Sequence, residues 1–426
     1  MDYAKRIKEK KYSWGGKAFA TVFPTRGSVS VVGSVLGGTR HSSSHELSQV
    51  HADMLLGGTL SHTKKELQLL LDEMGATLSF FVTDERLGFS GRVLTKHLNA
   101  YLQLLSEVLR EPLFPAEELA LNKQRQEANL ALEAQDTTRQ ANIALAWALF
   151  EKSHPNYAES TDEARKVLLS VTHASLLSLH KKIISRDSLV VSLAGDIAPQ
   201  KAFVLCEKHF KTLPKKVVPL AHFKKATRKT PKKVAISIKH KASIDYVLGV
   251  TTGMTSNDKE YGALLLGLQI LGSPSGFSGR LMKTVREEEG LTYGVYAYMS
   301  GFAHATDGYL CVWGTFAPQL LGKGRAAIKR EVALIVRTGV TETETIRHRE
   351  MFFLRSRVRL STSGAFARAA HDTATQGKSL SHLDTFPKHI RHLTKAQVNK
   401  ALKKYLVLGK MSEAAAGPVT TNTLSK

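Results

Sequence analysis

The stretch SQVHADMLLGGT, residues 48–59, indicates how the N-terminal part of this chain folds. Ser43 and Glu46 stand just before it at the spacing of a capping box, which predicts that a helix begins there. Gly57 and Gly58 predict where that helix ends. Apolar side chains recur between these limits at helical spacing, at Leu47, Val50, Met54 and Leu55. The sequence therefore predicts a helix with one face buried against a core.

Segments around this helix predict a sheet and further helices. Thr63 and Glu66 form a second capping box and predict another helix, which Gly75 ends. A long helix is predicted from Pro115 toward Phe150. Apolar runs predict strands at residues 18–23, 28–36, 76–82 and 87–93.

The second half of the chain repeats this order. A helix is predicted over 258–271, and the glycine-rich turn GSPSGFSG leads into a second one. Strands are predicted at residues 233–238, 245–252, 293–300 and 308–316. The repetition predicts an internal duplication of an α+β domain, in which helices cover one face of a mainly antiparallel sheet.

The length of 426 residues is too great for one hydrophobic core, in agreement with two domains. We expect these domains at 1–213 and 234–412. A basic linker at 214–233 would join them, and a flexible tail is predicted at 413–426.

Composition restricts the class of protein. The chain is 42% hydrophobic and 23% charged, which is typical of a globular protein, and no run approaches the roughly 18 apolar residues of a membrane span. The basic N-terminus is followed by no apolar segment with a cleavage site, so we expect a cytoplasmic protein, unless a leader has been removed. Cys206 and Cys311 lie far apart in the sequence and are expected to be buried apolar residues.

The formal net charge of +23 is concentrated between Lys201 and Lys241. The sequence contains no helix-turn-helix signature, no aromatic pair of an RNA-binding motif and no zinc-finger spacing, so we expect no nucleic-acid partner. Two interpretations stay open: a solvated basic surface, or attraction of an acidic protein or an acidic peptide substrate.

Several motifs, taken in order, resemble the insulinase/pitrilysin family of zinc peptidases. They are GSVLGGTR, MLLGGT, MGA and, in the second half, SGRLMKTVREEEGLTYGVYAY. The resemblance covers nearly the whole chain and is closest to the short bacterial and mitochondrial-processing-peptidase-like members. It implies two homologous α/β sandwich domains, as in metalloenzymes of the LuxS and processing-peptidase type.

Catalytic members of that family carry H-x-x-E-H on the first helix, where two imidazoles bind Zn²⁺ and the Glu accepts a proton from the bound water. Aligned through MLLGGT, this motif falls on residues 49–53. Gln49 and Asp53 stand at the two His positions, and Ala52 replaces the general base. An amide and one carboxylate make a poor zinc site, so we expect no metal in this chain.

The third zinc ligand of the family falls on Asn129, although Glu127 and Glu133 lie close enough to leave the register open. A shifted metal site is the alternative. Its candidates are His41, His45, His51 and His62 together with Asp53. His45 and His51 are six residues apart, however, and would lie on different faces of a regular helix.

Arg286 and Tyr293 match an Arg and a Tyr that, in the family, reach across a chamber toward the zinc of the catalytic half. Both side chains donate hydrogen bonds and could stabilise an oxyanion or hold a substrate carbonyl. The strand Ser79–Phe80–Phe81–Val82 matches the edge to which an extended peptide substrate adds. An ordinary half-buried strand explains its hydrophobicity equally well.

These matches predict the non-catalytic subunit of a heterodimeric zinc peptidase. The zinc would belong to a paralogous partner, and Arg286 and Tyr293 would act in trans on the peptide that this partner cleaves. The alternative is a catalytically inert scaffold or peptide-binding module, like the core subunits of respiratory complexes. The residues themselves distinguish a heterodimer from a homodimer only through the missing ligands.

Overall fold

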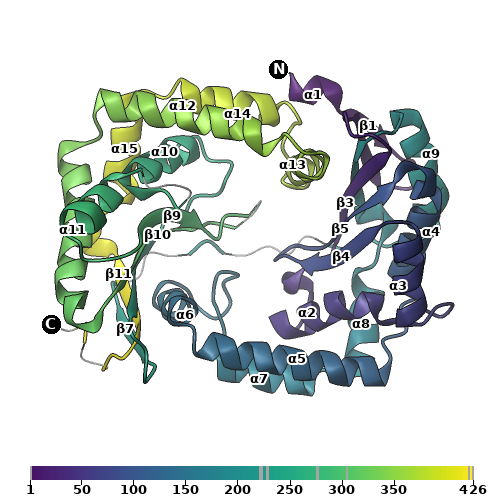
Figure 1. Ribbon diagram of the computed structural model, residues 1–426, viewed down its shortest axis with the longest axis horizontal. Coiled ribbons are helices and arrows are strands. Elements are labelled where there is room, and N and C mark those ends of the chain that lie inside the picture. Colours follow the sequence, from purple (N-terminus) through teal and green to yellow (C-terminus); the bar gives the residue numbers. More distant parts are fainter. Residues whose placement is uncertain are drawn as a thin grey trace. The chain divides into compact units, whose positions relative to one another are not determined.

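The computed structural model describes residues 2–219, 224–226, 230–274, 278–303, 306–420 and 423–424 (Figure 1). Their contacts divide the chain into two compact units. Unit 1 consists of Met1–Asn129, Asp162–Ala221 and Ser356–Thr385. Unit 2 consists of Leu130–Thr161, His222–Arg355 and Phe386–Lys426. Each unit therefore draws on segments from both halves of the sequence.

Unit 1 contains a six-stranded sheet. Its strands, in spatial order, are β1 (Lys8–Lys11), β2 (Lys17–Val22), β6 (Val190–Gly195), β3 (Ser28–Leu36), β5 (Arg86–Leu94) and β4 (Thr77–Val82). β2 and β6 run parallel, and all other neighbours are antiparallel. Eight of the nine residues of β3 are buried, as expected for a central strand covered on both faces.

Unit 2 repeats this plan without the extra edge strand. Its sheet has the order β7 (Lys233–Ser237), β11 (Ser412–Gly417), β8 (Ile244–Thr251), β10 (Tyr309–Phe316) and β9 (Val295–Ser300). The single parallel pair, β7 with β11, corresponds to β2 with β6. The predicted α+β class and the internal duplication are confirmed.

Helices pack around both sheets. In unit 1 they are α1 (Tyr3–Arg6), α2 (His45–Met54), α3 (Lys64–Glu73), α4 (Leu98–Arg110), α7 (Thr161–Ser170), α8 (His173–Ile183) and α9 (Pro199–Phe210). In unit 2 they are α10 (Tyr261–Gly272), the π-helix η5 (Met282–Glu288), α11 (Leu321–Thr338) and α15 (Lys395–Tyr405). Four helices contribute residues to both units. They are α7, which contributes only Thr161 to unit 2, and α5 (Ala116–Ala134), α12 (Glu342–Arg359) and α14 (His382–Arg391). Single 3₁₀ turns lie at Thr39–His41, Leu55–Gly57, Thr95–His97, Arg186–Ser188, Pro318–Leu320 and Leu408–Lys410.

The second face of each sheet is covered by a helix from the opposite half of the sequence. α13 (Ser363–Thr375) packs on β3 and β6 of unit 1, where Phe366 shares a cluster with Val32. α6 (Thr137–Leu149) packs on β8 and β11 of unit 2, where Leu145 contacts Gly249. The expectation of helices on one face only was therefore wrong, because sequence patterns do not reveal which distant helix closes a sheet.

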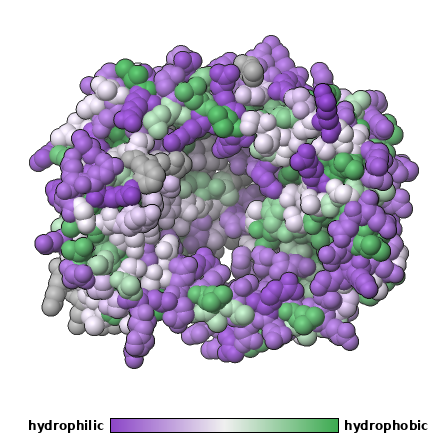
Figure 2. Space-filling view, viewed as in Figure 1, coloured by the Kyte–Doolittle hydropathy of each residue, from purple (hydrophilic) through white to green (hydrophobic). Residues whose placement is uncertain are grey.

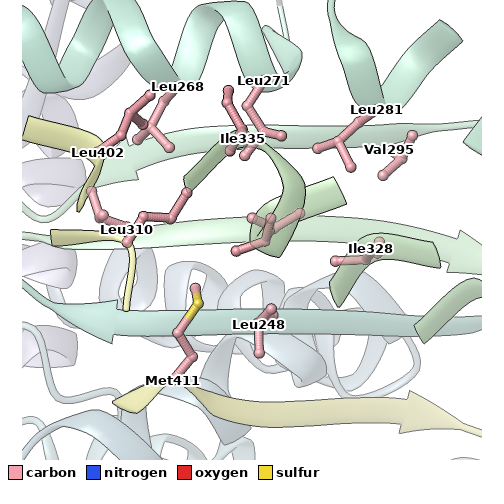
Figure 3. Close-up of a cluster of buried hydrophobic side chains, with 14 of the residues drawn as sticks. Leu248, Leu268, Leu271, Leu281, Val295, Leu310, Ile328, Ile335, Leu402 and Met411 are labelled. Atoms are coloured by element: carbon pink, nitrogen blue, oxygen red, sulfur yellow. The ribbon is translucent and has the colours of Figure 1, made fainter. Parts of the chain in front are cut away.

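The core of unit 2 lies between its sheet and helices α10, α11 and α15. Leu248 and Leu310 come from the strands, and Leu268, Ile335 and Leu402 come from the three helices (Figure 3). Each of these five side chains is at most 1% exposed. Burial of one such side chain contributes about 2 kcal/mol to folding.

Two helix boundaries differ from the prediction. The single helix expected from Pro115 toward Phe150 is two helices, because Asp136 interrupts it and caps α6 by accepting from the Arg139 amide at 3.0 Å. The predicted capping box before α2 is one residue out of place, since Ser44 is the cap and accepts from the Leu47 amide at 3.1 Å. The box of Thr63 and Glu66 is confirmed.

The predicted flexible tail was wrong for residues 413–417. They form most of β11, which pairs with β7 and β8. This strand buries a charged residue, Glu413, because three donors satisfy its carboxylate. It accepts from Tyr246 at 2.8 Å, Arg325 at 2.9 Å and Lys329 at 2.6 Å. Small residues carry little strand propensity, so the sequence did not indicate this strand.

Several sequence features lie partly outside the described residues, namely 275–277 of the GSPSGFSG turn and residues 220–223 and 227–229 of the basic linker. Cys206 and Cys311 are buried as predicted, and burial raises the pKa of the Cys206 thiol to about 12. Apolar residues are scattered singly among hydrophilic ones over most of the face in Figure 2.

Candidate functional site

The helix α2 presents Gln49 and Asp53, the two positions aligned with zinc-binding histidines, on its outer side. Gln49 and Asp53 are one turn apart, and the Gln49 side-chain amide donates to Asp53 Oδ1 at 2.9 Å. Ala52, at the general-base position, is 1% exposed and is part of the apolar core. The helix thus keeps its buried face, while its outer face carries a hydrogen-bonded amide and carboxylate.

Two residues of α5 complete this arrangement. Gln126 Nε2 donates to Asp53 Oδ2 at 2.9 Å and to Asn122 Oδ1 at 3.0 Å, and Asn122 Nδ2 lies 3.4 Å from the same Asp53 oxygen. Asn129, the predicted third-ligand position, is exposed further along α5. The structure therefore brings Asn122 and Gln126 to Asp53. Sequence reasoning missed both, since amides on a helix carry no recognisable signal.

These residues do not fit a zinc ion. Gln49, Asn122 and Gln126 direct N–H groups at the Asp53 carboxylate, so three amides surround one carboxylate where zinc requires imidazole, thiolate or several carboxylate ligands. Ala52 can transfer no proton. Among the described residues, no group of three or more His, Cys, Asp or Glu side chains is placed to hold a metal ion.

The histidines near α2 are not brought together. His51 is 1% exposed on the inner side of α2, and its Nε2 lies 3.0 Å from Nδ1 of His180 on α8. The ring of Phe114 packs against both imidazoles. His62 instead pairs with Glu107 at 2.8 Å. The described residues thus do not place these histidines in a group of three or more potential metal ligands.

Burial keeps the His51–His180 pair neutral. Desolvation, and then the neighbouring His180, holds the pKa of His51 well below its usual range. Desolvation also lowers the pKa of His180 to about 4, against hydrogen bonds to the backbone of Arg110 and Leu109. Burial on the inner face of α2 thus disfavours protonation of both imidazoles. The outer face of α2 carries a carboxylate.

Arg286 and Tyr293 are brought together in unit 2. Arg286 lies in the last turn of η5, and Tyr293 precedes β9, after a turn in which Gly290 has φ +61°. The guanidinium carbon lies 5.2 Å from the centre of the Tyr293 ring. Tyr293 is nevertheless 83% exposed, the most exposed aromatic side chain among the large hydrophobic ones described. This cation–π contact holds the phenol without burying it.

The predicted peptide-binding strand lies at one edge of the sheet of unit 1. Ser79–Val82 are the last four residues of β4, which pairs with β5 on one side and is the terminal strand of the sheet. α2 packs against β4. Arg368 of α13 lies 4.9 Å from the centre of the Phe81 ring. An extended peptide could add to this edge only through the backbone groups that β5 leaves unpaired.

A further polar cluster has the connectivity of a serine-hydrolase triad. Ser34 Oγ lies 2.7 Å from His371 Nε2, and His371 Nδ1 lies 2.9 Å from Asp372 Oδ1. Arg86 Nε donates to Ser34 Oγ at 2.5 Å. Ser34 is, however, 1% exposed beneath α13, so no substrate reaches it. The cluster joins α13 to β3 and satisfies buried polar groups.

Comparisons with known proteins agree with this architecture. The family described as Insulinase (Peptidase family M16) matches residues 44–153, and the description Peptidase M16 inactive domain matches residues 170–352. The two matches together span more than half of the chain. This chain belongs to peptidase family M16.

Similar proteins from bacteria cover most of the M16 chain. An uncharacterized zinc protease, YmxG of Bacillus subtilis, is 25% identical over 75% of this chain and 76% of its own length. A protein of Helicobacter pylori named Non-peptidase homolog YmxG is 23% identical over 86% of this chain and 83% of its own. A crystal structure titled peptidase M16 inactive domain, from Pseudomonas fluorescens, has a TM-score of 0.88 at 22% identity, and covers 97% of this chain and 99% of its own.

The family models establish the family, and the likeness to the solved structure establishes the fold. Within the described part of the chain, no helix has both the length and the apolar character to cross a membrane.

Proposed function

We propose that this M16 chain is the non-catalytic subunit of a heterodimeric zinc peptidase. A paralogous partner with H-x-x-E-H would bind the zinc and cleave extended peptides in the cytoplasm. Arg286 and Tyr293 would act in trans, donating hydrogen bonds to the substrate carbonyl and to the oxyanion that forms from it.

The observation that carries this proposal is that the Tyr293 side chain stays exposed although its ring contacts the Arg286 guanidinium. A large aromatic ring gains stability by burial, yet Tyr293 keeps 83% of its surface exposed. The contact with the Arg286 guanidinium restricts the ring and leaves the hydroxyl accessible. Two donors fixed side by side on an exposed surface suit the binding of a carbonyl better than they suit the stability of unit 2.

The former zinc helix supports a role without catalysis in this chain. Amide N–H groups donate to both oxygens of the Asp53 carboxylate, and Ala52 cannot act as a base. The terminal position of β4 supports peptide binding through Ser79–Val82. An inert scaffold or peptide-binding module would share these two features. A scaffold would not require the hydrogen-bond donors of Arg286 and Tyr293, so substituting these two residues distinguishes the two proposals.

The experiment is reconstitution with a zinc-bearing paralogue from the same genome. We expect the isolated chain to bind no stoichiometric zinc and to cleave no peptide, and the purified pair to carry about one zinc and to be active. Tyr293→Phe keeps the ring and removes only the hydroxyl donor. A partner that binds and is active, but whose rate is unchanged by Tyr293→Phe and by Arg286→Ala, would establish the scaffold.

A further inference from the structure

Unit 2 contains a cavity of about 620 Å³ that the zinc-peptidase proposal does not use. It lies between the start of η5, the end of α10 and one side of α12. Its lining residues are Ile270, Ser278, Gly279, Arg280, Lys283, Glu287, Glu344, Arg347, His348 and Arg355. Ligand pockets in proteins commonly have volumes of roughly 300–1,000 Å³, so this cavity has the size for a small molecule.

Basic side chains predominate in the cavity. Four lining residues are Arg or Lys and two are Glu, which gives a formal charge of +2 with the histidine neutral. One carboxylate is already neutralised: Arg280 binds both oxygens of Glu344, each at 2.8 Å. Burial opposes ionisation of Glu344, but hydrogen bonds from Arg280 and Thr341 outweigh it and hold its pKa at about 2. The Arg280–Glu344 pair is thus a fixed part of the wall.

Three further cations line the cavity beside this pair. Arg347 and Arg355 project from α12 two turns apart, and Lys283 comes from the first turn of η5. The nearest acid to Lys283 is Glu288, at 3.7 Å, in an ion pair whose two side chains are 72% and 55% exposed. Such a pair contributes little and dissociates readily in favour of a multivalent anion.

Two polar groups inside the cavity point to a ligand. Ser278 Oγ is buried, and none of the described residues gives it a hydrogen bond. His348 is 5% exposed and lines the cavity between Arg347 and Glu344 of the same helix face. Burial, followed by Arg347, lowers the pKa of His348, whereas Glu344 raises it. A buried hydroxyl and an imidazole can both donate to an anion held there.

We propose that this cavity of unit 2 binds a small polyanion through Arg347, Arg355 and Lys283, with Ser278 and His348 donating to it from inside. The planar guanidinium groups present paired N–H donors that match the oxygens of phosphate or carboxylate. Phosphate esters and polycarboxylates share this chemistry, and only a binding experiment separates them. Neither Arg286 nor Tyr293 lines this cavity.

The test is calorimetric titration of the full chain with three probes: inorganic phosphate, pyrophosphate and citrate. The variant Arg347→Gln/Arg355→Gln removes two cavity cations. Arg357→Gln/Arg359→Gln removes two exposed arginines of the same helix that do not line the cavity, and serves as the matched control. Both variants lose the same net charge, so non-specific attraction changes equally in the two proteins.

We expect pyrophosphate or citrate to bind with one site per chain. The cavity variant should bind at least tenfold more weakly, because charge-assisted hydrogen bonds are lost, and the control should change less than twofold. Ser278→Ala should weaken binding severalfold without changing net charge. Tighter binding of pyrophosphate assigns the site to phosphates, and tighter binding of citrate assigns it to carboxylates. No binding by any probe at millimolar concentration, or equal losses in the two double variants, would overturn the proposal.

Discussion

The outer face of α2 in unit 1 and the Arg286–Tyr293 pair in unit 2 differ in how far their polar side chains are satisfied within the chain. On α2, every polar side chain that replaced a zinc-motif residue is hydrogen-bonded to another, with Asp53 at the centre. In unit 2, Tyr293 stays 83% exposed beside a guanidinium. On α2 the polar side chains satisfy one another. In unit 2 the phenol of Tyr293 stays accessible, as the proposed role in trans requires.

Because of this difference, we expect substitutions at the Arg286–Tyr293 pair to lower activity without lowering stability, and substitutions on α2 to lower stability without lowering activity. In the reconstituted pair, Tyr293→Phe should lower kcat/KM for peptide cleavage by about 10²–10³, the usual effect of losing one oxyanion donor. Its free energy of unfolding should change by less than about 0.5 kcal/mol, since the hydroxyl is exposed. Steady-state kinetics and urea unfolding of the same preparations measure both. A control is Tyr296→Phe, whose ring stacks on Trp313 in β10.

If the rate and the stability fall together, Tyr293 is a structural residue and the comparison fails. If neither changes, the scaffold proposal replaces the half-enzyme one. The variant Arg286→Lys keeps the charge but loses the planar fork, and should show an intermediate rate.

The inner face of α2 predicts a dependence of stability on pH. Burial lowers the pKa of His180 to about 4, below the 6.5 of the unfolded chain, so protonation favours unfolding. The stabilisation is complete above pH 6.5 and is lost as the pH falls toward 4, by about 3 kcal/mol for this one residue. Urea unfolding at pH 7.5, 6.0 and 5.0 measures the loss.

His180→Gln keeps a hydrogen-bonding side chain and cannot titrate, so its stability should fall less steeply over this pH range. His62→Gln is the control, because His62 is partly exposed and pairs with a carboxylate. Parallel curves for wild type and His180→Gln would show that the buried pair contributes nothing to the pH dependence.

The sequence predicted most of the fold because local signals were strong. β3 matches its predicted range, and the capping box of Thr63 begins α3 as expected. β11 was missed because its Ala-rich run lacks β-branched residues and is buried through contacts of Glu413 with distant residues. The packing of α6 and α13 on sheets from the opposite half of the sequence was equally unpredictable, since local propensity does not show which sheet a helix contacts.

The residues of the candidate site were predictable only where they belong to a recognisable sequence motif. The spacing in REEEGLTY, interpreted through the family resemblance, led to Arg286 and Tyr293, and the structure places the two side chains in contact. The third-ligand position depended on counting along α5 without knowing how that helix meets α2. The structure brings Gln126 to Asp53 and leaves Asn129 exposed.

The contact between Gln126 and Asp53 leads to the third prediction. In the variant Gln49→His/Ala52→Glu/Asp53→His, two imidazoles replace the amide and carboxylate. Adding Gln126→Glu should raise zinc affinity at least tenfold more than adding Asn129→Glu, because residue 126 already contacts position 53. Competition with a zinc-sensitive dye measures the difference, and circular dichroism confirms that both quadruple variants fold. A preference for Asn129→Glu would restore the register that the sequence suggested.

The smallest effect is expected at Asp53 itself. Asp53→Ala leaves three amide groups without their acceptor, but they are near the surface and water replaces the lost bonds, so stability should fall by only about 1 kcal/mol. Peptide cleavage by the reconstituted pair should be unchanged. Gln49→Ala should cost a similar amount, and the double variant should cost less than the sum of the two, because both remove the same bond. Additive losses would mean that the outer face of α2 is a set of independent surface residues. A loss of activity would mean that the face contacts the partner or the peptide, and the contrast with Tyr293 would then disappear.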